Sequence, residues 1–308
     1  MTSSLQQPDW IKEGREKLLH LFSPGCGWGY FQEGAPCTEP TALACLALRA
    51  AQPAGQNDSP AADAAAQWLA SIQQPNGAVG VSKTVRTPEW PTPYAILVWS
   101  GKGKYAENTK NAIGWLLTQK GMTLEDERDI FGHDTTITGW PWVSGTHSWV
   151  EPTALAVMAL RRNGLQDHAR TQEGLRLIQD RCISAGGWNY GNNTVYGTTL
   201  RPQPAVTGIA LLALNGIQGI DPIVDSACNY LESTVPRLRA PQSLCWALLG
   251  LTAWERRPAA SEDWLEEIYR LVVKKSERAP QLAYLLLAAS SQSLGLLGIQ
   301  SVTTGGSA

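Results

Sequence analysis

Charged side chains are scarce in this chain. Asp, Glu, Lys and Arg make up 17% of its 308 residues, whereas about 25% is typical of a globular protein. The formal net charge is only -2, so the chain offers no basic face of the kind that binds nucleic acid. We therefore expect a large apolar core and no nucleic-acid partner.

Signals for membrane insertion, secretion and metal binding are absent as well. No apolar run reaches the about 18 residues that suggest a membrane span, and Met1 to Lys17 is too polar for a signal peptide. The 6 cysteines form no Cys-x-x-Cys pair, and runs such as "ALACLAL" are typical of buried free thiols. Without metal-ligand spacing or an aspartate-rich diphosphate motif, we expect a cytoplasmic protein that uses no metal or other cofactor.

What the sequence repeats is a short helix led by proline. "CTEPTALACLALRA" at 37–50 returns as "WVEPTALAVMALRR" at 149–162, and the pattern recurs elsewhere. Proline suits the first helical turn because its missing N–H would have no partner there. These uncharged helices are apolar on all sides and must therefore be buried on all sides. They start at Pro40, Pro91, Pro152, Pro204, Pro241 and Pro280.

A charged, amphipathic segment precedes each apolar helix. In "SEDWLEEIYRLVVKK", for example, Leu265, Tyr269 and Val272 recur at three- and four-residue steps, as on a surface helix. Six buried helices inside six amphipathic ones predict an all-α protein, an (α/α)6 barrel with negligible sheet. The last apolar helix is no polar cap of the kind that an open solenoid needs, so we expect the ring to close. We expect a single domain over residues 1–300 and a mobile tail over 301–308.

The loops that lead from outer to inner helices should all lie at one end of the barrel, where the inner-helix N-termini converge. Four of them are long, at Ser23–Thr38, Pro75–Trp90, Gly121–Val150 and Ala185–Gln203, and long loops in a compact domain are usually functional. Several of the 13 tryptophans stand in these loops. We therefore expect the functional site at this end, which we call the mouth.

Several motifs resemble those of the prenyltransferase and squalene-cyclase repeat family. "SIQQPNGAVG" keeps the first half of that family's Gln-x-Pro-Asp/Asn-Gly-Gly-Trp motif, and "GCGWGY" and "GGWNYG" keep the Gly-x-Trp half. The resemblance covers essentially the whole chain and implies the same barrel. More narrowly, the chain is similar to a class II terpene cyclase that stands alone as one barrel domain, as in bacterial meroterpenoid biosynthesis.

This resemblance implies an activity and a substrate. The protein would be a metal-independent isomerase that protonates a linear prenyl chain, carried on an aromatic acid or phenol, and cyclises it through a carbocation. Its partner would be this prenylated small molecule, and uptake of such a substrate is compatible with a peripheral membrane contact. Class II cyclases carry Asp-x-Asp-Asp at the start of the second inner helix, but Trp90, Pro91, Thr92 and Pro93 occupy those positions here. Either the proton comes from elsewhere or the chain is no cyclase.

A proton donor of this kind must be a carboxylic acid that keeps its proton near pH 7, which burial promotes. Asp134 is our first candidate, because it lies in the third long loop near Trp140 and has no counterpart in another repeat. His133 or Thr136 would tune it by hydrogen bonding. An Asx turn is the structural alternative for this aspartate.

Glu39 and Glu151 are the other carboxylates to weigh, and both stand in an "EPTALA" setting. A carboxylate beside a helix N-terminus is favoured by the helix dipole without any catalytic role. Because the chemistry needs one acid, the duplication favours a structural role for both. Glu151 is kept as the second catalytic candidate.

Aromatic faces in the mouth can bind the substrate and stabilise its cation, and we expect a share of the loop aromatics to do so and the remainder to brace the loops. Arg201, next to the fourth inner helix, is the candidate to hold a carboxylate or phenolate on the substrate head, and an ordinary surface arginine is the alternative. The aromatic candidates are Trp90, Trp140, Trp142, Trp149, Trp188, Tyr190 and Tyr196.

Two other functions fit the same features. A glycosidase on this barrel would also combine tryptophan platforms with two carboxylates. A non-catalytic lipid- or protein-binding barrel would explain why the aspartate motif is missing.

Overall fold

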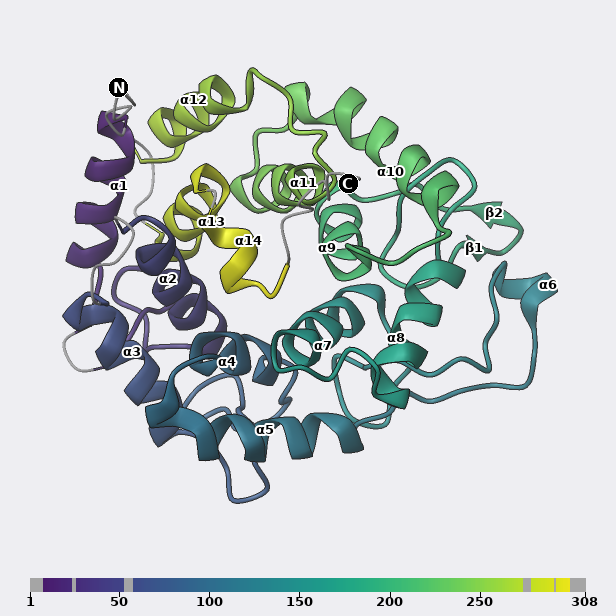
Figure 1. Ribbon diagram of the computed structural model, residues 1–308, viewed down its shortest axis with the longest axis horizontal. Coiled ribbons are helices and arrows are strands. Elements are labelled where there is room, and N and C mark those ends of the chain that lie inside the picture. The colour runs from purple at the N-terminus through teal and green to yellow at the C-terminus, as the bar shows by residue number, and fades with distance from the viewer. Residues whose placement is uncertain (1–7, 24–25, 53–57, 274–277, 291, 300–308) are drawn as a thin grey trace, which may run out of the picture.

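The computed structural model describes residues 8–23, 26–52, 58–273, 278–290 and 292–299. The tail expected to be mobile, at 301–308, lies outside these residues. The described part of the chain consists of alternating outer and inner helices and their connecting loops (Figure 1).

The inner helices begin within two residues of the repeated prolines, and their side chains are almost all buried. They are α2 (Thr38–Ala50), α4 (Thr92–Trp99), α7 (Val150–Arg162), α9 (Pro204–Leu214), α11 (Pro241–Ala253) and α13 (Ala279–Ala289). No helix in the described ranges is both long enough and apolar enough to cross a bilayer.

The outer helices are the amphipathic segments, which bury one face against the inner ring. They are α1 (Asp9–His20), α3 (Pro60–Ser71), α5 (Ala106–Thr118), α8 (Ala169–Asp180), α10 (Asp221–Thr234) and α12 (Ser261–Val273). The last inner helix, α13, packs against the first, α2, and α12 meets α1, so both rings close (Figure 1). The predicted (α/α)6 barrel is confirmed.

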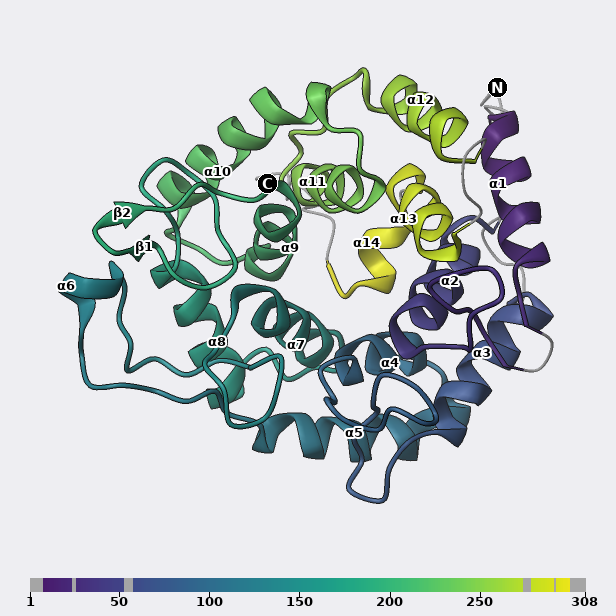
Figure 2. The same cartoon turned by 180° about the vertical axis from the view of Figure 1, so that it is seen from behind.

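The remaining elements are short and were not predicted. They are α6 (Arg128–Phe131), α14 (Ser293–Leu296), two single-turn 3₁₀ helices, η1 (Gly103–Tyr105) and η2 (Val235–Arg237), and the antiparallel strands β1 (Thr194–Val195) and β2 (Thr198–Thr199). The α6 segment lies beside β1 at the rim, which both views show (Figures 1 and 2).

The α14 helix lies inside the ring of inner helices and packs on α2 and α11 (Figure 1). Leu294 and Leu297 are buried there. Because α14 follows the C-terminus of α13, it covers the end of the barrel opposite the mouth.

Three of the long mouth loops are fastened to the inner helices in the same way. In each, a tryptophan backbone N–H donates to a threonine hydroxyl on the following inner helix, over 2.9 to 3.0 Å. The pairs are Trp28 with Thr41, Trp140 with Thr153, and Trp188 with Thr207. A Cβ on Gly139, just before Trp140, would lie 2.4 Å from the Thr153 hydroxyl, so glycine is required there.

The indoles of the same tryptophans are also structural. Each is fully or almost fully buried and donates its Nε1–H to a backbone carbonyl of the preceding outer helix. The acceptors are Leu18 at 2.8 Å, Leu116 at 2.8 Å and Ile178 at 2.6 Å. Each of these tryptophans, of which Trp28 and Trp188 belong to the "GCGWGY" and "GGWNYG" motifs, thus joins a loop to one outer and one inner helix.

Candidate active site

A cavity of 630 Å³ opens at the mouth, and this volume is within the about 300 to 1,000 Å³ that is usual for ligand pockets. Its walls come from the N-terminal turns of α2, α7, α11 and α13 and from three of the long loops. The lining residues are Tyr30, Phe31, Glu39, Trp90, Trp142, Glu151, Ala240, Pro241, Gln242, Arg278, Pro280, Gln281 and Tyr284. We call it the barrel cavity.

Glu39, in the first turn of α2, is held by two tyrosines. Tyr30 donates its hydroxyl to Oε2 at 2.5 Å, and Tyr284 donates to Oε1 at 3.2 Å. Burial raises the pKa of the Glu39 carboxyl, and the two tyrosine hydrogen bonds lower it by less, so that the pKa is raised overall. Both oxygens therefore have donors that favour the charged form.

Glu151, in the first turn of α7, lines the same cavity but has no hydrogen-bond donor among the described residues. Burial, and then the charge of Glu39, raise the pKa of Glu151 to about 7. The helix dipole favours a carboxylate at this position, but desolvation outweighs it. A large share of Glu151 is therefore protonated at neutral pH.

A neutral phenol lies among these carboxyl groups. Tyr94, on α4, is fully buried, and its hydroxyl has no hydrogen-bond partner among the described residues. Burial, and then the charges of Glu39 and Glu151, raise the pKa of Tyr94 well above its ordinary value. A buried hydroxyl without a partner is costly.

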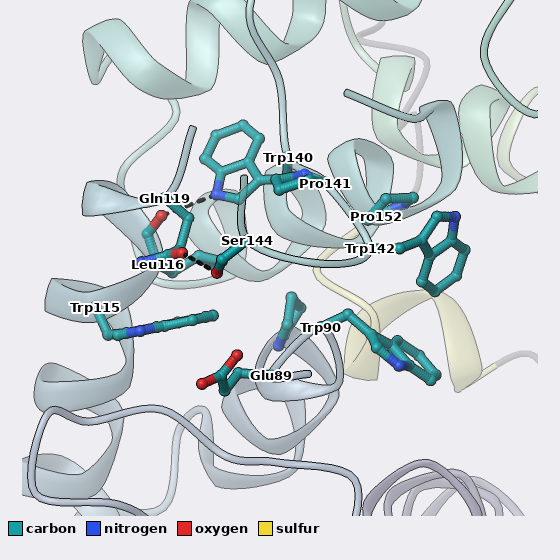
Figure 3. A pocket seen from close by; sticks show the side chains of 11 residues that line it. Glu89, Trp90, Trp115, Leu116, Gln119, Trp140, Pro141, Trp142, Ser144 and Pro152 are labelled. Atoms are coloured by element: carbon teal, nitrogen blue, oxygen red, sulfur yellow. Dashed lines mark hydrogen bonds between the residues drawn. The ribbon is translucent and has the colours of Figure 1, made fainter. Parts of the chain in front are cut away.

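Trp90 and Trp142 form an aromatic wall of the barrel cavity. Their ring centroids are 4.8 Å apart, and the planes meet edge to face at 77°. Figure 3 shows the two rings together, with Trp140 on the far side of a small neighbouring cavity. Glu89 lines that small cavity and not the barrel cavity.

Arg278, just before α13, is a cavity residue that the sequence analysis missed. Its guanidinium lies over the Phe31 ring, 4.9 Å from the centroid, and both residues line the barrel cavity. Tyr30 and Tyr284, which also line the cavity, were missed as well, and so was the nearby Tyr94, which does not line it. Tyr30 could have been found from its place two residues after the tryptophan of the "GCGWGY" motif. Nothing in the local sequence distinguishes Tyr94, Arg278 or Tyr284.

The structure places Asp134 outside the barrel cavity, in an environment unsuited to a proton donor. Its Oδ1 accepts the Thr136 hydroxyl at 2.6 Å and the Thr136 N–H at 2.9 Å, and Oδ2 pairs with Arg128 at 2.9 Å. These contacts, above all the Thr136 hydroxyl, hold the pKa of Asp134 below its ordinary value. The carboxylate carries no proton at neutral pH, and its geometry is the Asx turn weighed as the structural alternative.

His133 and Thr136 share that loop and likewise do not reach the barrel cavity. His133 is buried, 3% exposed, and lines a separate cavity with Trp149. Thr136 does hydrogen-bond Asp134 as expected, but it stabilises the charged form.

Of the predicted substrate-binding residues, Trp90 and Trp142 are brought together in the barrel cavity and the others are not. Trp140 and Trp188 are buried, and their indole N–H groups hydrogen-bond the outer helices and hold their loops in place. The remainder are exposed on the mouth loops away from the cavity: Trp149, Tyr190, Tyr196 and Arg201.

The described residues include no group of three or more His, Cys, Asp or Glu side chains placed to hold a metal ion. Cys45, Cys228 and Cys245 are buried free thiols, as expected. Independence from a metal or other cofactor stays a prediction, because it concerns turnover.

No protein-family model matches the sequence, and no curated protein matches it either. Solved structures with a similar fold do exist. A protein from Actinoplanes is 14% identical, with a TM-score of 0.57 over 86% of this chain and 80% of that chain. The type II terpene cyclase MstE from Scytonema is 14% identical, with a TM-score of 0.54 over 85% of this chain and 78% of that chain.

A variant of that cyclase has been solved in complex with geranylgeranyl dihydroxybenzoate as substrate. It is 17% identical to this chain, with a TM-score of 0.53 over 84% of this chain and 78% of that chain. At these low identities, the TM-scores establish a shared architecture and no more. The chain has the fold of a type II terpene cyclase.

Proposed function

We propose that this protein is a proton-initiated cyclase of a linear prenyl chain and that Glu151 donates the starting proton. One observation carries the proposal: a carboxyl group with a pKa raised to about 7 lines an aromatic cavity in which no other described residue hydrogen-bonds it. A general acid works best when its pKa lies near the working pH.

The reaction would begin when Glu151 transfers its proton to a terminal alkene or epoxide of the bound chain. The alkene π electrons form the new C–H bond, and the neighbouring carbon becomes a cation that the next alkene attacks. Loss of a proton from the last cation completes the isomerisation. Glu151 is then left as a carboxylate at a helix N-terminus, where the α7 dipole stabilises it.

Glu39 has a different part in this scheme. Burial raises the pKa of Glu39 overall, but its two tyrosine hydrogen bonds favour the charged form, and Glu151 has no such bonds. We therefore assign the negative charge of the pair to Glu39 and the proton to Glu151. This charge keeps the proton on Glu151 and stabilises a cation formed nearby. The α4 helix lies between α2 and α7 in the ring (Figure 1), so the two glutamates flank the helix on which the family resemblance implies an aspartate motif.

The aromatic lining supports a cationic intermediate. Trp90, Trp142 and Phe31 present rings to the cavity, and a ring face attracts a cation by about 0.5 to 2 kcal/mol, most strongly when water is excluded. Such apolar rings also exclude water, which would otherwise react with the cation and end the cyclisation.

An aromatic acid or phenol is the head group that we propose. The substrate in the neighbouring cyclase complex is a geranylgeranyl dihydroxybenzoate, and this cavity contains an arginine that can pair with such an acid. We assign the contact to Arg278, which lines the cavity, in place of Arg201, which does not.

The test is incubation of the purified chain with prenylated dihydroxybenzoates in D₂O, followed by chromatography and mass spectrometry. Proton entry from solvent and loss of a substrate proton should yield a new isomer that is one mass unit heavier. Turnover should survive EDTA. A product that gains no deuterium, or activity that EDTA removes and Mg²⁺ restores, would contradict the proposal.

A glycosidase is the second candidate, because two glutamates with unlike environments share one aromatic cavity, as acid and base do in such enzymes. Release of nitrophenol from aryl glycosides, with no turnover of any prenylated substrate, would favour it.

A further inference from the structure

A second cavity, of 220 Å³, lies between the third and fourth mouth loops. It shares no lining residue with the barrel cavity, and the proposed cyclisation makes no use of it. The volume is below the about 300 to 1,000 Å³ of pockets for drug-sized ligands. Its occupant is therefore small, about the size of one substituted ring. We call it the loop cavity.

The walls of the loop cavity are mainly apolar. Phe131, Ile137 and Trp149 line it, together with the side chains of Met122 and Leu124. Aromatic and branched apolar side chains of this kind form the usual surroundings of a planar ring.

Two buried polar groups also line this cavity. His133 is 3% exposed, and its Nδ1 has no hydrogen-bond partner among the described residues. Arg181 is 5% exposed. Its terminal nitrogens donate to the carbonyls of Gly191 and Asp134, but its Nε–H makes no hydrogen bond, although Asp180 Oδ2 lies 3.4 Å away.

Of the two buried polar groups, only Arg181 is charged at neutral pH, because burial, and then the charge of Arg181, lower the pKa of His133 to about 4. None of the described residues that line the loop cavity is acidic, although Asp180 lies behind Arg181, 3.4 Å from its Nε. A buried donor without a partner costs about 1 to 3 kcal/mol, so a ligand that accepts from it gains that amount back. A carboxylate is the acceptor that arginine binds most strongly.

We propose that the loop cavity is a second small-molecule site, which takes a one-ring aromatic carboxylate such as benzoate. The ring lies among Phe131, Ile137 and Trp149, and the carboxylate accepts from Arg181 and His133. This site does not depend on the barrel cavity's being catalytic.

The two cavities contain different tryptophans, so one experiment can separate them. The full chain labelled with 5-fluorotryptophan is titrated with benzoate and followed by ¹⁹F NMR, and Trp149→Phe and Trp142→Phe assign the two signals. We expect a saturable shift of the Trp149 signal while the Trp142 signal stays in place. A shift of Trp142 alone, or no saturable shift of Trp149, overturns the proposal.

Benzyl alcohol tests whether the carboxylate contributes to binding, because it has the same ring as benzoate but no charge. We expect it to bind at least tenfold more weakly than benzoate. Equal affinity overturns recognition of the carboxylate.

Cavity-filling variants test the position. Ile137→Phe should reduce benzoate affinity at least tenfold, whereas Val143→Phe, on an exposed side chain of the same loop outside the cavity, should leave it unchanged. Leu124→Phe, at the exposed rim of the cavity, should weaken binding even if Ile137→Phe does not fold. Wild-type affinity in both cavity variants overturns the assignment.

Discussion

Glu39 and Glu151 stand in the same six-residue setting, "EPTALA", on the first turns of two inner helices, and yet their surroundings differ. Glu39 accepts hydrogen bonds from Tyr30 and Tyr284. Glu151 accepts none from any described residue and has its pKa raised to about 7. The difference lies in side chains that other parts of the chain bring to each carboxyl group.

The mouth loops account for part of this difference. Tyr30 follows Trp28 by two residues, and Trp142 follows Trp140 by the same spacing, so the two occupy matching places in their repeats. A tyrosine hydroxyl binds the first glutamate, whereas the second lines the same cavity as the Trp142 indole and has no such bond. The exchange of a tyrosine for a tryptophan at this position can therefore favour a charged carboxylate at Glu39 and a protonated carboxyl group at Glu151, although the two helices are similar.

The largest effect should come from Glu151→Gln, which removes the proton donor and keeps the shape of the side chain. We expect turnover to fall by about 10² to 10⁴-fold, with an unchanged circular dichroism spectrum and unchanged substrate binding. Glu39→Gln is the matched control and should retain more activity, because it removes a charge and not the proton. Equal losses in both variants would mean that the two glutamates act as a pair.

The pH profile should show the state of Glu151. Activity needs the protonated form, so kcat should be level below the pKa of about 7 and fall about tenfold for each pH unit above it. Since the charge of Glu39 raises this pKa, Glu39→Gln should move the fall to lower pH. Steady-state rates between pH 5 and 9 measure both, and a rate that rises through pH 7 would contradict the assignment.

Tyr30→Phe should make the two glutamates more alike. The variant removes the 2.5 Å hydrogen bond to Glu39, so the Glu39 carboxyl loses a contact that favours its charged form. A hydrogen bond to a charged group contributes about 1.5 to 3 kcal/mol. We expect the pKa of Glu39 to rise and kcat to fall about tenfold. Tyr284→Phe, which removes the longer bond of 3.2 Å, should have the smaller effect on kcat, and the reverse order would count against this reading.

The smallest effect should come from Asp134→Asn. The aspartate lies outside the barrel cavity, so we expect kcat within about twofold of wild type. Because its pKa is lowered from 3.8, the charged form stabilises the fold above that pH, and this stability is lost as pH falls through the folded pKa. Thermal unfolding at pH 7 should show a loss of up to about 1 kcal/mol, which disappears in strong acid. An inactive Asp134→Asn variant would mean that Asp134, in the third mouth loop, is the proton donor.

The barrel could be predicted because its signals are local and repeated. Pro40 and Pro152 open helices that are apolar all round, and the segment around Leu265 and Tyr269 has the spacing of an outer helix. The α14 helix was not predicted, because a helix of four residues is too short to show the helical spacing of apolar residues. Its place inside the ring depends on the burial of Leu294 and Leu297 against other helices.

The mouth loops show where prediction from sequence ended. Trp140, Trp142 and Trp188 were all expected in a substrate site, yet only Trp142 lines the barrel cavity. The direction of a loop side chain depends on partners far along the chain, here Thr153 and Leu116 for Trp140. No periodicity reports such contacts.

By itself, the sequence determined the helices, their order, and the end of the barrel at which the 630 Å³ cavity opens, because helical period and proline position act over a few residues. Only the tertiary structure decided which carboxyl group keeps its proton. A pKa depends on desolvation and on neighbouring charges and donors. For Glu151 the neighbours are the walls of a cavity built from four inner helices and three loops, and they meet only when the ring is closed.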